Sequence, residues 1–272
     1  MLTIEAVTPD DSTRSGSPAA GERGLLRRAV AVLDTLAAID APPTVRVIAE
    51  QSGLSKSAVQ RILVELENVD LAVQDPATRR YRLGPRTLAL GVAYQRRLSV
   101  REAAVGPMTS LCAEASETVG LSVGYADRLL HIEQVEPQRS LNARFHVGRP
   151  LPLWSGAPAR VLLAARSNEA IARVLEVHEH TDIEPVNPPS PEDLLREVEE
   201  VRRTGHARAF EETLAGVHTV SVPVYGAHGE LAAVLSITAP SSRLPADRMD
   251  ELLPRLVTAA ADIAARLGYR AP

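Results

Sequence analysis

The sequence predicts two parts: an α-rich N-terminal winged helix-turn-helix and a C-terminal α+β domain in which helices cover an antiparallel sheet. Three observations support this prediction. Residues 42–83 read continuously as two short helices and a hairpin, the apolar period changes from helical to alternating after residue 118, and helical and strand-like segments are interspersed from there onward. With 272 residues, the chain is long enough for two domains that each bury a core.

Residues 24–39 form the first predicted helix, and its apolar stripe is wider than one small core requires. The stripe consists of Leu25, Leu26, Ala29, Val32, Leu33 and Leu36. Contact with a second copy of the chain or complete burial inside the domain would each account for the surplus. Residues 1–22 mix Pro, Ser, Gly, Asp and Thr without an apolar run, so we expect a disordered tail and no signal peptide.

The helix-turn-helix begins after two prolines. Thr44 is a candidate N-cap for a short helix over 44–51, and Gly53 permits a tight connection to the next helix, which Ser55 is expected to cap. Apolar side chains recur on one face of that second helix. Its opposite face carries Lys56, Ser57, Gln60 and Arg61. Donor-rich side chains near a helix N-terminus are typical of a recognition helix in the DNA major groove. We predict that they contact DNA together with the two capping residues, Thr44 and Ser55.

A basic hairpin follows, with predicted strands over 71–74 and 80–83 joined by a turn at 75–78. Its arginines are Arg79, Arg80 and Arg82, which are suited to phosphate or minor-groove contacts. Any small three-helix module would show similar apolar spacing, so the hairpin is what favours DNA over a purely structural role. The net charge of −4 and the pI of about 6.0 exclude a generally polycationic nucleic-acid coat.

The predicted domains are a tail over 1–22, the winged domain over 23–84, a linker helix over 85–99 whose regular part covers 86–98, and an effector-binding and oligomerisation domain over 100–272. Within the last domain we expect helices over 100–117, 156–165, 168–178, 191–204 and 245–267, and strands over 118–125, 129–135, 207–211, 219–225 and 231–238.

Several function classes lack support in the sequence. The single cysteine, Cys112, excludes an intramolecular disulfide, lies in an apolar helical run where a packed thiol is expected, and fits a reducing cytoplasm. No apolar stretch reaches the roughly 20 residues that span a bilayer. The tripeptide His178-Glu179-His180 is interpreted as a solvated turn and not as a metal site. We therefore expect no membrane, metal or cofactor.

Catalysis is not expected either. Glu211 and Glu212 would point to opposite sides of a strand, which is poor geometry for shared acid/base chemistry. The sequence also contains no nucleophile elbow, phosphate-binding loop or dinucleotide fingerprint.

Three segments could line a small-molecule pocket. The turn from Trp154 to Arg160 leads into a helix, whose free N–H groups favour a carboxylate. Thr219 lies on one predicted strand, and alternation places Ser236 and Thr238 on one face of another. Together these groups predict a polar floor for a metabolite that carries a carboxylate. Ordinary strand hydroxyls with local hydrogen bonds are the alternative.

The chain from about 24 to 270 resembles the IclR family of bacterial transcriptional regulators. Five segments carry the resemblance, in the family's order: GLSKSAVQRILVELE, RRYRLGPRTLALG, VGRPLPLWSGAPARVLLA, EEVRRTGHARAFEETLAGVHTVSVPV and LAAVLSITAPSSRL. The resemblance implies an N-terminal winged domain, a linker helix and a GAF-like α+β effector domain. It also implies a pocket lined by Gly156, Ala157, Pro158, Thr219, Ser236 and Thr238.

The sequence departs from the family's usual residues in and around this pocket, for which Trp154 and Ala209 are further candidate lining residues. Gly156 stands where family members often carry threonine or serine, and Ala159 stands where they often carry glycine. Arg160 is one of the two basic residues, lysine or arginine, that are common at its position, and Pro158 removes one backbone donor. A common acidic residue is replaced by Ala209, a frequent cysteine by Thr219, and a small or polar residue by Trp154. Trp154 either covers an apolar or aromatic effector or only packs in the core.

From these features we expect a cytoplasmic transcription factor that binds a partly palindromic double-stranded operator as a homodimer, with a dimer of dimers as the alternative. A small organic acid, aromatic acids included, would enter the C-terminal pocket and release or remodel the complex. Repression is the expected sign, with activation as the alternative. An enzyme with an appended interaction domain and an adaptor that does not bind DNA are the rivals from other classes.

Overall fold

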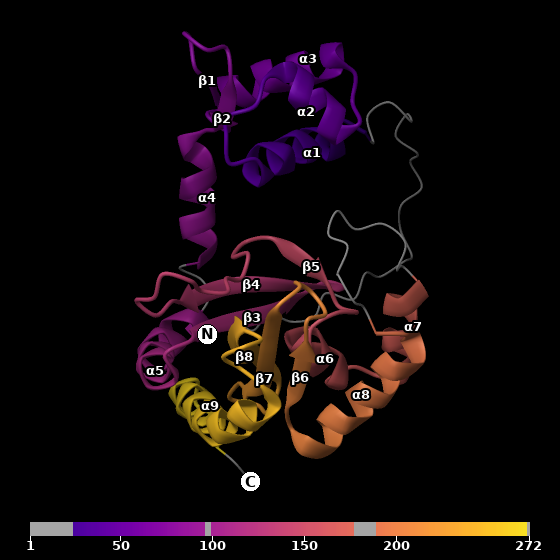
Figure 1. The fold of residues 1–272 in the computed structure, drawn as a ribbon. Coiled ribbons are helices and arrows are strands. Elements are labelled where there is room, and N and C mark those ends of the chain that lie inside the picture. Colours follow the sequence, from indigo (N-terminus) through magenta and orange to yellow (C-terminus); the bar gives the residue numbers. More distant parts are fainter. Residues whose placement is uncertain (1–23, 96–98, 177–188, 271–272) are drawn as a thin grey trace. The chain divides into compact units, whose positions relative to one another are not determined.

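The computed structural model describes residues 24–95, 99–176 and 189–270. The described residues divide into two units at residues 94 and 95, and the elements of each are drawn in Figure 1. Each unit has its own apolar core. The N-terminal unit is a winged helix-turn-helix and the C-terminal unit is α+β with an antiparallel sheet, so the predicted fold class is confirmed. The predicted tail and His178-Glu179-His180 lie outside the described residues.

The N-terminal unit packs three helices against a small hairpin. Its elements are α1 (Leu25–Ala38), α2 (Val45–Ser52), α3 (Lys56–Asn68), β1 (Ala72–Gln74), β2 (Tyr81–Leu83) and α4 (Pro85–Gln95). Val32, Ile48, Leu63 and Tyr81 lie at the centre of the core. The hairpin strands are each one residue shorter than predicted, and the expected linker helix is described only as far as Gln95, since 96–98 lie outside the described residues.

The two predicted helix caps differ. The Ser55 hydroxyl accepts a hydrogen bond from the Ala58 N–H at 3.3 Å, which confirms it as the cap of α3. Thr44 occupies the N-cap position of α2, but its side chain makes no capping hydrogen bond. Gly53 ends α2 with a φ of 67°, a left-handed conformation that glycine adopts without steric cost.

The apolar stripe on α1 is only partly used within the unit. Val32 and Leu36 are buried, whereas Leu25 and Leu26 are 60% and 80% exposed. Complete burial of the stripe inside the domain is therefore ruled out. The exposed end of α1 is open to another contact.

The C-terminal unit is built on a six-stranded antiparallel sheet with the order β5-β4-β3-β8-β7-β6. Its strands are β3 (Thr118–Tyr125), β4 (Arg128–Val135), β5 (Pro150–Pro152), β6 (Ala207–Phe210), β7 (Val217–Tyr225) and β8 (Leu231–Pro240). Its helices are α5 (Ser99–Ala115), α6 (Ala157–Ala164), α7 (Asn168–Glu176), α8 (Pro191–Thr204) and α9 (Ala246–Arg266). Figure 1 shows α5 and α9 on one side of the sheet and α6, α7 and α8 on the other.

Strand alternation separates apolar from hydroxyl side chains on β7. Val220, Val222 and Val224 belong to the core shared with α5 and α9. Thr219 and Ser221 therefore face the opposite side, where α6 packs against β7. The hydroxyls thus lie on one face of the sheet, as the alternation predicted.

One local prediction was wrong and one strand was missed. Strand β6 ends at Phe210 instead of continuing to residue 211, because Glu211 has a φ of 54° and turns the chain away from the sheet. Glu212 is consequently a loop residue. In addition, β5 was not predicted, because a strand of three residues with prolines at both ends has no readable alternation.

Candidate DNA interface and ligand cavity

The N-terminal half of α3 presents an exposed polar face. Ser55, Lys56, Ser57, Gln60 and Arg61 are all exposed, while the apolar residues on the other side of the helix are buried. Within the described part of the chain, no ion pair joins the Lys56 or Arg61 side chain to a carboxylate. Both cations are therefore available to a negatively charged partner.

Some of the predicted DNA-contacting residues also take part in the fold, as the Ser55 cap does. The Gln60 amide lies 3.5 Å from the buried Tyr81 hydroxyl, at the outer limit of a hydrogen bond. Thr44 is half-buried at the start of α2. Arg61 is accordingly the cleaner reporter of DNA contact.

The hairpin arginines divide into one that supports the fold and two that are open. The Arg80 guanidinium donates to the Pro42 carbonyl at 2.8 Å, which ties the hairpin to the segment before α2. Arg79 and Arg82 are exposed. The turn that presents them is held by the Asp75 carboxylate, which accepts the N–H groups of Thr78 and Ala77, and these two bonds lower the Asp75 pKa below its usual value.

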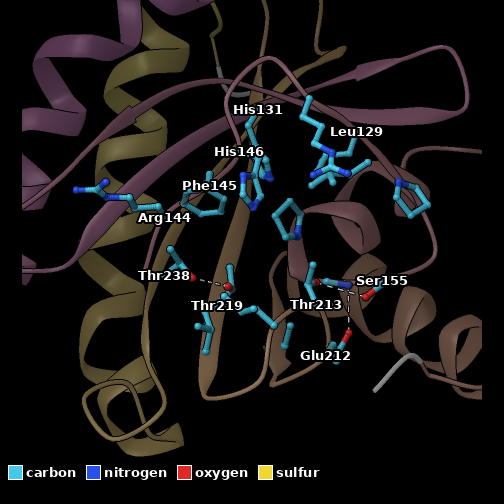
Figure 2. A pocket seen from close by; sticks show the side chains of 18 residues that line it. Leu129, His131, Arg144, Phe145, His146, Ser155, Glu212, Thr213, Thr219 and Thr238 are labelled. Carbon is cyan, nitrogen blue, oxygen red and sulfur yellow. Dashed lines mark hydrogen bonds between the residues drawn. The ribbon is translucent and has the colours of Figure 1, made fainter. Parts of the chain in front are cut away.

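A cavity of about 280 Å³ opens on the α6 side of the C-terminal sheet (Figure 2). The sheet, the segment 144–149, the loop 212–214 and the start of α6 contribute its walls. Its apolar lining residues are Leu129, Phe145, Leu151, Pro152, Pro158, Ala209, Leu214 and Val217, and the remainder are His131, Arg144, His146, Arg149, Ser155, Gly156, Glu212, Thr213, Thr219 and Thr238.

The cavity contains part of the set expected from the sequence. Five of the expected residues line it: Gly156, Pro158, Ala209, Thr219 and Thr238. Three do not. Trp154 and Ala157 pack in the apolar cluster of α6, and the Ser236 hydroxyl is fully buried against Ser221 at 2.7 Å. Trp154 is 6% exposed and is thus a core residue in this structure.

The two threonines on the cavity floor are bonded to each other. The Thr238 hydroxyl donates to the His218 carbonyl at 3.0 Å and lies 2.8 Å from the Thr219 hydroxyl. Because a hydroxyl has one proton, Thr219 must donate to Thr238 in this arrangement. Both protons are used, so the floor offers acceptor lone pairs to a ligand. This polarity suits a donor better than a carboxylate.

The start of α6 already holds a carboxylate of the protein itself. The Gly156 N–H donates to Glu212 Oε2 at 3.1 Å, and Glu212 Oε1 pairs with the Arg160 guanidinium. Arg160 is only 2% exposed and pairs with Glu197 as well. The helix N-terminus that the sequence assigned to an effector carboxylate is thus occupied by Glu212.

Gly156 is required at this point for two reasons. Its φ is 89°, and a Cβ built there would lie 2.9 Å from the Thr213 hydroxyl. A side chain would therefore be strained by the backbone conformation and would force the Thr213 hydroxyl to move. Glycine permits the close approach that brings Glu212 to the helix.

The opposite wall carries groups that the sequence did not single out. Figure 2 shows His131, Phe145 and His146 gathered on the side away from Thr219 and Thr238. The His131 imidazole is buried, and its Nδ1 lies 2.7 Å from the Ser122 hydroxyl, within hydrogen-bond distance. The centroids of the His131 and Phe145 rings are 4.5 Å apart. Burial and, to a smaller extent, His146 lower the His131 pKa to about 3, so the ring is neutral at physiological pH.

The segment that supplies Phe145, His146 and Arg149 has no apolar period, because it is irregular apart from one bridge between Val147 and His131. The only feature of the sequence that could have pointed to this segment as a cavity wall is its proximity to the GRPLP sequence at 148–152. Arg144 pairs with Glu136 at 2.8 Å, whereas Arg149 forms no ion pair with any carboxylate among the described residues. Arg149 and His146 are the donors available to a ligand on this wall.

Other types of site find no support in the described residues. The ranges 24–95, 99–176 and 189–270 contain no group of three or more His, Cys, Asp or Glu side chains placed to hold a metal ion. None of the helices in these ranges is long and apolar enough to cross a membrane. Cys112, as expected, is buried in the core, and burial raises its pKa.

A winged helix-turn-helix joined to an α+β domain with a ligand-sized cavity defines the class of DNA-binding transcriptional regulators. Comparison with known proteins identifies the family within this class. Residues 25–76 match the model of the IclR helix-turn-helix domain, and residues 92–265 match that of the bacterial transcriptional regulator IclR C-terminal domain. The chain belongs to the IclR family.

Curated relatives and solved structures agree with this assignment. The chain is 30% identical over 216 residues to the transcriptional regulator KdgR of Escherichia coli, covering 79% of this chain and 82% of the relative. It is 24% identical over 259 residues to the transcriptional repressor IclR of the same organism, covering 93% of each chain. The crystal structure of an IclR regulator from Alicyclobacillus acidocaldarius aligns with a TM-score of 0.75 at 27% identity, covering 90% of this chain and 98% of that one. All three are named as transcriptional regulators or repressors.

Proposed function

We propose that the protein is a repressor that binds a partly palindromic operator as a dimer through α3 and the β1-β2 hairpin, in the compartment that holds the DNA. A small organic acid in the C-terminal cavity would change the affinity for the operator. The observation that carries the DNA contact is the exposed face of α3, where Lys56 and Arg61 have no carboxylate partner in the described chain.

The contacts divide by role. Arg61 and Gln60, one turn into α3, are assigned to base edges, while Ser55, Lys56 and Ser57 at the helix N-terminus are assigned to phosphate or base contacts. Arg79 and Arg82 on the hairpin are assigned to the phosphate backbone or minor groove. Arg80 and Thr44 support the fold of the interface, and a contact with DNA would be additional to that role.

The test begins with selection of a binding site from a random double-stranded DNA pool by the full chain. Arg61→Ala should then weaken binding to the selected site by about 1–3 kcal/mol and relax the base preference at one position of each half-site. Arg203→Ala is the matched control, because Arg203 is exposed on α8 in the other unit and should leave affinity unchanged. Equal affinity of the Arg61 variant and the wild type at matched salt would remove Arg61 from the interface.

Repression is proposed because several relatives are named repressors, among them IclR of Escherichia coli. Modulation by a ligand is supported by the cavity, which is apolar with a few convergent polar groups, as ligand sites commonly are. Dimerisation is supported by the exposed apolar side chains of the N-terminal unit, Leu25, Leu26, Val30, Leu88 and Leu90. A reporter gene under the selected site that becomes more active when the chain is deleted would support repression, and one that becomes less active would make the protein an activator.

A further inference from the structure

The cavity has two chemically different ends. At one end lie Glu212 and the bonded pair Thr219 and Thr238, which present acceptors. On the opposite wall lie His146 and Arg149, which follows Gly148, whose N–H donates to the His131 carbonyl at 2.8 Å. Arg149 presents donors and positive charge there, and His146 presents a ring nitrogen. A ligand that binds between them must match both ends.

The acceptor end is fixed by a network of hydrogen bonds. One carboxylate oxygen of Glu212 accepts the Gly156 N–H and the other pairs with Arg160, so neither oxygen can leave without breaking a charge-assisted bond. Arg160 also pairs with Glu197. One cation facing two carboxylates leaves a net negative charge at the start of α6, where a further carboxylate would be repelled.

We propose that Glu212 is a built-in carboxylate that fills the anion site at the start of α6 and thereby sets the direction in which the ligand binds. The ligand is a carboxylic acid with a hydroxyl at its far end. The hydroxyl donates to the Glu212 and threonine end, and the acid group faces Arg149 and His146. This inference rests on the proposed function only in that the cavity is the ligand site.

The first experiment asks whether Glu212 fills an anion site. Glu212→Ala should lower Tm, and acetate should raise the Tm of this variant more than chloride at the same ionic strength does. The wild type should show no such acetate-specific rise. The Trp154 fluorescence follows this unit selectively, because Trp154 is the only tryptophan in the chain and is buried there.

Two matched variants isolate the effect. Glu211→Ala removes the neighbouring carboxylate, which is exposed and does not line the cavity, and should show no acetate response. Glu197→Ala removes the other partner of Arg160 but leaves the bond from Gly156 to Glu212 in place, so it should not respond either. An equal acetate response in the wild type or in both controls, or none in Glu212→Ala, would overturn the proposal.

Failure of Glu212→Ala to fold would not leave the question open. Recovery of folded protein on refolding in acetate but not in chloride would be the same positive result, and no recovery in either would be negative. Glu212→Gln keeps an acceptor for the Gly156 N–H and removes the charge. It should fold without acetate.

The second experiment tests the direction of binding with hexanoate, ω-hydroxyhexanoate and hexanediol as matched compounds. For the wild type, the hydroxy acid should raise Tm more than the other two, because only it matches both ends. In Glu212→Gln the preference for the hydroxy acid over hexanoate should fall at least severalfold. A hexanoate shift equal to that of the hydroxy acid, or no shift from the hydroxy acid at millimolar concentration, would overturn the assigned direction.

These measurements use no DNA, so their outcome is separable from that of the proposed function. A protein that passes both tests but binds no selected DNA would keep the ligand site and lose the operator model. A protein that binds DNA but fails the acetate test would keep the operator model and lose the role of Glu212.

Discussion

At the scale of single residues, His131 shows how burial decides a protonation state. The ring lies inside the cavity wall and its pKa is lowered to about 3, whereas a solvated histidine in the unfolded chain has a pKa of about 6.5. As the pH falls below 6.5, the unfolded state takes up a proton that folded His131 refuses until about pH 3. Stability of the C-terminal unit that is present above pH 6.5 is therefore lost as the pH falls through this window.

This gives a prediction for urea unfolding followed by Trp154 fluorescence. His131 alone should lower the free energy of unfolding of the C-terminal unit by about 2 kcal/mol between pH 7 and pH 5. The reason is that each pH unit below 6.5 contributes about 1.4 kcal/mol. His131→Gln should remove that part of the pH dependence, whatever it does to stability at pH 7. His228→Gln, in an exposed loop, is the control and should retain the wild-type slope. Identical slopes in the wild type and His131→Gln would mean that His131 is not buried as a neutral ring.

At the scale of elements, the fit between β3 and the segment that covers it depends on Gly120. A Cβ at this position would lie 2.3 Å from the Phe145 ring, a distance that real atoms do not reach. Phe145 lines the cavity, and its backbone N–H donates to the Gln134 side chain at 2.9 Å, which anchors the backbone that carries the ring. Gly120 therefore sets the depth at which Phe145 sits.

We expect Gly120→Ala to destabilise the C-terminal unit by about 1–3 kcal/mol through overpacking. Gly124→Ala is the control on the same strand, because its nearest contact would be Leu162 at an ordinary 3.6 Å. Urea unfolding of both variants provides the comparison. Adding Phe145→Leu to Gly120→Ala should recover part of the loss, and a double-mutant cycle without coupling would show that the two residues do not meet.

The elements also show what the sequence can and cannot predict. Helix α3 and strand β7 were predictable because each has a buried and an exposed face at its own period, and so were the positions of Thr219 and Thr238. The role of Glu212 was not, because it depends on one residue, Glu211, whose φ of 54° ends the strand. Likewise, the segment from Phe145 to Arg149 reaches the cavity through irregular backbone, which leaves no period in the sequence.

At the scale of the whole molecule, the exposed apolar side chains of the N-terminal unit require an explanation. Leu26 on α1 is 80% exposed and Leu88 on α4 is 71% exposed, so two helices of this unit each leave a large apolar side chain in water. A palindromic operator requires two copies of α3 related by a twofold axis. In a twofold interface the same leucine is contributed by each of the two copies. Burial in a dimer would therefore explain both the exposure and the symmetry of the site.

Leu26→Glu should accordingly shift the protein toward monomer in sedimentation experiments without unfolding it, because residue 26 contacts solvent in the single chain. Because both copies carry the substitution, the dimer interface loses two buried leucines. This should weaken the dimer by about 3 kcal/mol or more, roughly a hundredfold in Kd. Affinity for DNA with two half-sites should fall with it, while affinity for one half-site should not. Arg27→Glu introduces the same side chain at the adjacent exposed position and is the control. If Leu26→Glu and Leu88→Glu both sediment like the wild type, the chain dimerises through another surface or not at all.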